Sequence, residues 1–108
     1  MSAASNALAG QVSAIDRRGS ERVDIALWSR IRLHGRPDHA LRICNVSNDG
    51  VMAMTPCPVS DGDHVQIELP AIGWHEATVV WSFGDRIGAS FARPVEQETF
   101  ARFKAVQR

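Results

Sequence analysis

The stretch WHEATVVWSFGDRIGASFA, residues 74–92, predicts two antiparallel strands joined by a tight turn. Apolar residues occupy every second position from 77 to 83, which is the period of a strand with one buried face. Gly84 and Asp85 then form a dipeptide typical of two-residue hairpin turns. The apolar alternation resumes from 87 to 91. This part of the chain therefore predicts a β-hairpin.

Four more segments upstream alternate in the same way, at residues 23–33, 39–46, 51–55 and 64–69. They are separated by runs rich in turn residues: HGRPD, SNDG and PCPVSDGD. The two prolines of the last run cannot lie in a central strand, so they end the third segment. The sequence thus predicts six short antiparallel strands.

The segment that follows Pro94 predicts a helix over about residues 94–107. Proline suits the first helical turn, acidic residues come early and basic residues late, and Phe100, Phe103 and Val106 recur at three-residue spacing. With one helix to cover them, six strands hide their edges best by closing on themselves. We expect an all-β fold, a six-stranded antiparallel β-barrel with a C-terminal α-helix.

Composition limits the domain organisation and the partners. A chain of 108 residues fits one domain, with residues 1–15 as a flexible tail and residues 16–108 as the barrel domain. Twelve basic and twelve acidic residues cancel, which argues against proteins that coat DNA, RNA or anionic membranes, so an anion site must be local. No stretch resembles a signal peptide or a membrane span, which predicts a cytoplasmic protein without membrane insertion.

Residues that could carry catalysis or hold a metal are scattered. The four histidines lie in or beside separate turns and strand ends, and Asp61, Asp63 and Glu68 lack the ligand spacing of a calcium loop. Cys44 and Cys57 lie outside any paired metal-ligand spacing and are expected to be reduced, buried and inert. We expect no enzyme activity, no metal and no cofactor.

Two short motifs stand out instead. Arg18 and Arg22 have three residues between them just before the first predicted strand, and NVSNDG places Asn45, Ser47 and Gly50 where the second strand turns into the third. Each motif alone is ordinary: the second could be a simple Asx-type turn, and another arginine pair of the same spacing occurs at 32 and 36. Their order and placement carry the information.

An RxxxR pair before the first strand, an NxSxxG after the second and the closing VVWSFGDRIGASF together resemble the PilZ family of bacterial cyclic di-GMP receptors. The likeness covers about residues 17–92. It implies a PilZ-type β-barrel that acts in second-messenger signalling as a nucleotide-binding receptor and passes the signal to a downstream protein partner. The implied ligand-binding residues are Arg17, Arg18, Arg22, Asn45, Ser47 and Gly50.

The chemistry of these residue types suits that ligand. Cyclic di-GMP presents two phosphates and two guanine bases, and the planar arginine fork donates in pairs to phosphate oxygens or to guanine O6 and N7. Gly19 and Ser20 favour a loop that folds over the ligand when two phosphates remove the repulsion between its guanidinium groups. Arg17 is compatible with a stacked pair of ligand molecules, and one ligand molecule is the alternative.

The rest of the site is expected on the barrel surface. Asn45 and Ser47 occupy alternate positions and should share a face, and Gly50 should let the backbone turn and leave room for the purine. Trp81 is expected to pack in the core.

Two other classes of protein remain as alternatives. The first is a PilZ-like adaptor that binds only proteins. The second is a barrel that binds single-stranded nucleic acid, although the strands show few aromatics interleaved with basic residues.

Overall fold

The computed structural model describes residues 22–107. All six predicted strands are present and are followed by one helix. Their bounds are β1 Val23–Leu33, β2 His39–Val46, β3 Gly50–Met54, β4 His64–Leu69, β5 Gly73–Phe83, β6 Arg86–Phe91 and α1 Gln97–Val106. The predicted tail over residues 1–15 lies outside the described part of the chain.

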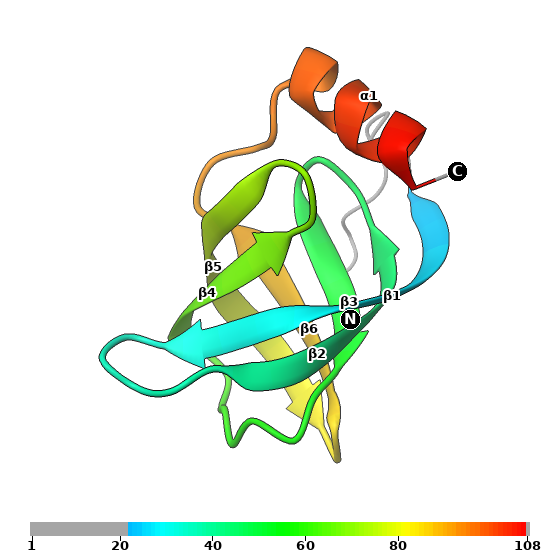
Figure 1. Ribbon diagram of the computed structural model, residues 1–108. Coiled ribbons are helices and arrows are strands. Elements are labelled where there is room, and N and C mark those ends of the chain that lie inside the picture. Colours follow the sequence, from blue (N-terminus) through cyan, green and yellow to red (C-terminus); the bar gives the residue numbers. More distant parts are fainter. Residues whose placement is uncertain (1–21, 108) are drawn as a thin grey trace.

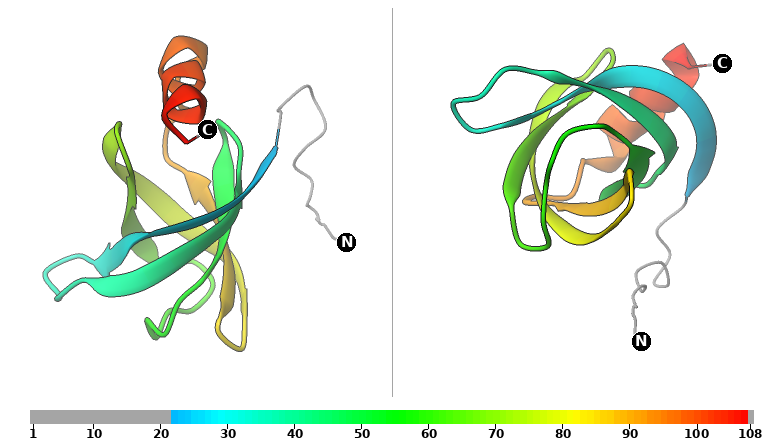
Figure 2. Two further views of the ribbon diagram at one scale, coloured as in Figure 1. Left: turned by 45° about the vertical axis from the view of Figure 1, so that its right-hand side comes forward. Right: turned by 90° about the horizontal axis from the view of Figure 1, so that it is seen from below.

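The strands form a closed antiparallel barrel, as predicted, and their order around it is β1-β2-β3-β6-β5-β4 (Figure 1). Strands that follow one another in sequence are paired, except that β3 pairs with β6 instead of β4. Closure occurs between β1 and β4, where Ile31 lies opposite Ile67 and Leu33 opposite Val65. The view along the barrel in Figure 2 shows the ring that results.

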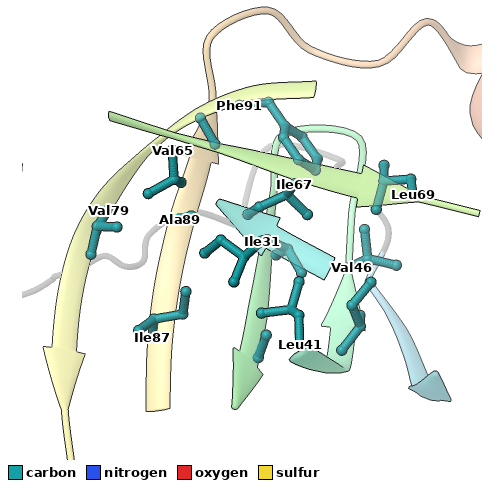
Figure 3. Packing of buried hydrophobic residues seen from close by; sticks show 14 of the residues in the cluster. Ile31, Leu41, Val46, Val65, Ile67, Leu69, Val79, Ile87, Ala89 and Phe91 are labelled. Carbon is teal, nitrogen blue, oxygen red and sulfur yellow. The ribbon is translucent and has the colours of Figure 1, made fainter. Parts of the chain in front are cut away.

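Inward-facing side chains from all six strands fill the barrel (Figure 3). Ile31, Leu41 and Ile67 are fully buried at its centre. The helix lies across one end of the barrel, where the rings of Phe100 and Phe103 stack with centroids 5.9 Å apart (Figures 1 and 2). Phe103 is fully buried, so the helix is part of the core.

The helix begins later than the sequence predicts. It starts at Gln97, and Pro94 lies in the linker that leads to it. The backbone N–H of Val95 donates to the carbonyl of Asn48 instead of entering a helical turn. Val106 was expected on the buried face with the two phenylalanines but is exposed. The helix therefore starts later than predicted, and its buried face does not include Val106.

A bulge in β5 also overturns an expectation. Val79 pairs with Ala89, but Trp81 pairs with Gly88, so one extra residue interrupts the alternation. Trp81 is 38% exposed and Phe83 is 82% exposed, and the prediction that Trp81 packs in the core is wrong. The indole instead covers β6 from outside: a Cβ built on Gly88 would lie 2.1 Å from the Trp81 Nε1.

Within residues 22–107, no helix is both long enough and apolar enough to cross a bilayer.

Candidate functional site

Strand register brings the second motif next to the entry of β1. Val23 pairs with Val46 and Asp24 pairs with Asn45, so Arg22 lies just beyond the last pair and beside the end of β2. The β2–β3 turn lies at the end of the barrel that the helix covers (Figure 1). Positions more than 20 residues apart in sequence thus meet at one end of the barrel. Arg17 and Arg18 lie outside the described residues.

Arg22 is exposed, and within residues 22–107 its side chain forms no ion pair. A guanidinium carries five N–H donors in a planar fork, which suits a phosphate or a base edge. The exposed carboxylate of Asp24 lies two residues further along the same strand. This negative charge means that the entry of β1 is not a uniformly positive surface.

Asn45 lies on β2 between two paired neighbours, Asp24 on β1 and Met52 on β3. It is half-buried, so part of its amide remains accessible. A side-chain amide carries both donors and an acceptor and can pair with a base edge. Asn45 is the motif residue best placed to reach a ligand from the sheet itself.

Ser47 is buried, at 6% exposure, and its hydroxyl serves the turn. The backbone N–H of Asp49 donates to the Ser47 Oγ at 3.1 Å, and the N–H of Ser47 donates to the carbonyl of Gly50 at 2.9 Å. The sequence allowed a simple Asx-type turn here, and the turn is indeed supported by a side chain, but by the Ser47 hydroxyl and not by an Asn or Asp. A hydroxyl that accepts one bond still carries a proton that it can donate.

Gly50 is required for a reason that the sequence does not reveal. Its φ is not in the left-handed region, unlike that of Gly35 or Gly84. A Cβ at this position would lie 2.4 Å from the backbone carbonyl oxygen of Ala89 on β6. The expectation that Gly50 lets the chain turn is therefore corrected: it allows β3 and β6 to approach closely.

The turn is also fixed from the other side by the segment before the helix. The N–H of Phe91 donates to the carbonyl of Asp49 at 2.8 Å, and that of Val95 donates to the carbonyl of Asn48 at 2.7 Å. Backbone hydrogen bonds between distant segments hold a loop in a defined conformation. The NxSxxG motif is consequently a preorganised part of the surface.

The other arginines of β1 are already engaged. Arg30 bonds Glu68 at 2.9 Å and Asp38 at 3.2 Å, and hydrogen bonding and charge from Glu68, followed by Asp38, raise its pKa. The guanidinium of Arg32 lies 3.9 Å from the ring centroid of Trp74. Arg32 is partly buried and also donates to Gln66. Arg32, one member of the arginine pair at 32 and 36, is thus already engaged by other residues of the protein.

Groups that could carry other chemistry do not converge. In the described part of the chain, no three His, Cys, Asp or Glu side chains lie close enough to hold a metal ion. His75 contacts the ring of Phe91, with centroids 5.7 Å apart, and His64 lies beside Thr78 on the barrel wall. Cys57 is buried, and Cys44 is only partly so. The described residues offer an arginine and a polar strand end as the candidate site.

A closed six-stranded antiparallel barrel followed by a terminal helix is a PilZ-like fold. Comparison with solved structures gives the same class. The PilZ domain of YcgR from Escherichia coli with c-di-GMP superimposes with a TM-score of 0.57 at 14% identity, covering 85% of this chain and 89% of that one. The inhibitor of motility MotI/DgrA of Bacillus subtilis gives a TM-score of 0.59 at 20% identity over 84% of this chain.

A longer YcgR chain in complex with c-di-GMP matches with a TM-score of 0.57 at 14% identity over 84% of this chain. The match covers 44% of that YcgR chain and 49% of MotI/DgrA. No family model matches the chain, and no curated protein matches it. At such low sequence identity, these structural matches establish a shared fold.

Proposed function

We propose that this protein is a non-catalytic cyclic di-GMP receptor that signals through a protein partner. The observation that carries the proposal is the register of β1 on β2, which sets the exposed Arg22 beside Asn45 and the Ser47 turn. Solved PilZ-like neighbours that contain c-di-GMP support it.

The roles follow from the chemistry of each group. Arg22 offers a two-pronged donor to a phosphate or to the O6 and N7 edge of guanine. Asn45 offers an amide at the strand surface, and Ser47 offers the remaining hydroxyl proton. Gly50 keeps β3 against β6 so that the turn stays in place. Arg17 and Arg18 complete the site from the preceding arm, which closes over the ligand.

The zero net charge of the chain supports a directed site over a general anion trap. A receptor of this kind gains affinity from a few charge-assisted hydrogen bonds, each contributing about 1.5–3 kcal/mol. Loss of one such arginine should therefore weaken binding by roughly ten- to a hundredfold. Asn45 and Ser47 are held by the barrel. The proposed conformational change on ligand binding is therefore the ordering of the segment that carries Arg17 and Arg18.

Isothermal titration of the full chain with cyclic di-GMP tests the proposal, with GTP and cyclic di-AMP as controls. We expect saturable heat with cyclic di-GMP alone, and its stoichiometry distinguishes one ligand molecule from a stacked pair. Arg18→Ala and Arg22→Ala should each weaken binding as above. The matched control is Arg102→Ala on the exposed face of α1, which should leave binding within twofold. Absence of heat with the folded protein would refute the receptor function and favour the protein-only adaptor.

A further inference from the structure

One row of side chains crosses the outer face of five strands in register. Trp28 on β1 pairs with Arg42 on β2, Arg42 with Met54 on β3, Met54 with Arg86 on β6, and Arg86 with Phe83 on β5. Directly opposed residues of an antiparallel pair project to the same side of the sheet. We refer to these five residues as the cross-strand face.

This face is open to solvent and rich in apolar surface. Trp28 is 68% exposed and Phe83 is 82% exposed, Arg42 and Arg86 are exposed, and Met54 is half-buried. Four strand spacings of about 4.8 Å give the row a length of roughly 19 Å. Large exposed aromatics in such an arrangement mark an interaction surface rather than scattered surface residues.

A second row broadens the face towards the helix-covered end of the barrel. It runs from Asn45 on β2 through Met52 on β3 to Gly88 on β6, which the Trp81 indole covers. The β-bulge that turns Trp81 outward thus adds a third aromatic beside the cross-strand face. Asn45 belongs to this row, so the face borders the proposed ligand site.

The two arginines of the face are not neutralised within the described residues. Neither Arg42 nor Arg86 forms an ion pair or a side-chain hydrogen bond there, whereas Arg30 and Arg32 bond Asp38, Glu68 and Gln66. An unpaired guanidinium beside exposed aromatic rings is poised to meet a carboxylate. The charge of the face therefore specifies what should cover it.

We propose that the cross-strand face docks a partner protein whose surface presents acidic side chains next to apolar ones. Aromatic residues, methionine and arginine are the types enriched at the centres of protein interfaces, and they make up the whole row. A second copy of this chain fits poorly, because two such faces would bring four unpaired arginines together. Single-stranded nucleic acid fits poorly as well, because two cations do not form a positive track along a strand.

The proposal does not depend on ligand binding, so its test is made without cyclic di-GMP. Random 16-residue peptides displayed on phage are selected on the immobilised full chain, and the best binders are synthesised and measured by fluorescence polarisation. We expect peptides enriched in Asp and Glu beside Leu, Phe or Trp. Arg42→Glu with Arg86→Glu, and separately Phe83→Ser, should weaken them at least tenfold.

The matched control is Arg102→Glu, a charge reversal on an exposed position of α1, which should leave peptide affinity within twofold. Phe83→Ser removes a ring that is 82% exposed, so the fold does not depend on it. Circular dichroism confirms that each variant is folded. The proposal is overturned if no peptide is selected, if the peptides lack acidic residues, or if the face variants bind as well as the parent.

Two further measurements test the other occupants. A fluorescein-labelled dT12 oligonucleotide should not bind, and affinity for it that Arg42→Glu with Arg86→Glu abolishes would assign the face to nucleic acid. Sedimentation velocity should show a monomer, and a dimer that Phe83→Ser dissociates would assign the face to a second copy. Either result would overturn the proposal while leaving the cyclic di-GMP titration unaffected.

Discussion

Replacing Gly50 with alanine should destabilise the barrel even when no ligand is present. The added Cβ would lie 2.4 Å from the Ala89 carbonyl oxygen, whereas real Cβ contacts essentially never fall under 3.0 Å. β3 and β6 must separate by at least 0.6 Å here, because the atom that the Cβ would meet belongs to the backbone and cannot rotate away. Forced backbone shifts of this kind cost about 1–3 kcal/mol, and a weakened β3–β6 hydrogen bond adds about 1 kcal/mol.

We therefore expect Gly50→Ala to lower the free energy of unfolding by roughly 2–4 kcal/mol, measured by urea unfolding followed by tryptophan fluorescence. The sign is decisive, because alanine at an unstrained glycine position normally stabilises by about 0.4–1 kcal/mol through the unfolded state. Gly62→Ala is the control: it introduces a left-handed alanine in open space and should cost only about 1 kcal/mol. A neutral or stabilised Gly50→Ala variant would refute the close-approach argument and return Gly50 to a purely ligand-based role.

Three further outcomes follow from the packing. Gly88→Ala should destabilise the fold because its Cβ would meet the Trp81 indole at 2.1 Å, and in a double-mutant cycle Trp81→Ala should relieve most of that loss in urea unfolding. Phe103→Ala removes a fully buried ring and should lower the free energy of unfolding by about 3–5 kcal/mol; a loss under 1 kcal/mol in the same assay would mean that α1 is not part of the core. Burial, followed by the charge of Asp63, raises the pKa of the Cys57 thiol. The unfolded chain therefore loses this proton at a lower pH than the folded chain, and the free energy of unfolding should fall as the pH rises above about 8.5. Cys57→Ser should remove this pH dependence in thermal melts.

The barrel was predictable because its strands alternate cleanly and because turn residues separate them. β4 repeats a buried apolar residue at every second position, and most of the inward positions of β1 and β2 are apolar as well, so the burial of Leu41 and Ile67 follows directly. Closure was inferred from the lack of helices to cover the strand edges, and the β1–β4 pairing satisfies that argument. Local pattern and global topology agree in these segments.

The errors occur where tertiary contacts override a local pattern. Trp81 continues the apolar alternation of β5, but a bulge reverses its direction, and a bulge has no signature in the apolar pattern. Pro94 reads as a helix start, but the hydrogen bond from Val95 to Asn48 holds that part of the chain outside the helix. The role of Gly50 depends on Ala89, 39 positions later, so no inspection of the motif alone could reveal it.

The candidate site was predicted in part. Sequence order suggested that the RxxxR and NxSxxG motifs meet, and the register of Asp24 on Asn45 sets Arg22 beside the second motif. The sequence does not reveal the cross-strand face, because its aromatic and basic residues lie on different strands. Trp28, Arg42 and Phe83 come together only through the pairing of their strands, and the sequence of a single strand does not show which strand it pairs with.

The linker between β6 and α1 lacks regular secondary structure, yet its length is set by the hydrogen bonds from Phe91 and Val95 to the β2–β3 turn. An added residue there would break one bond or the other and displace the helix that closes the barrel. Anyone who wishes to graft a fluorescent reporter or an affinity tag into this domain should avoid that linker. The exposed hairpin tip around Gly35, where a Cβ would meet nothing within 4 Å, is the place to insert it.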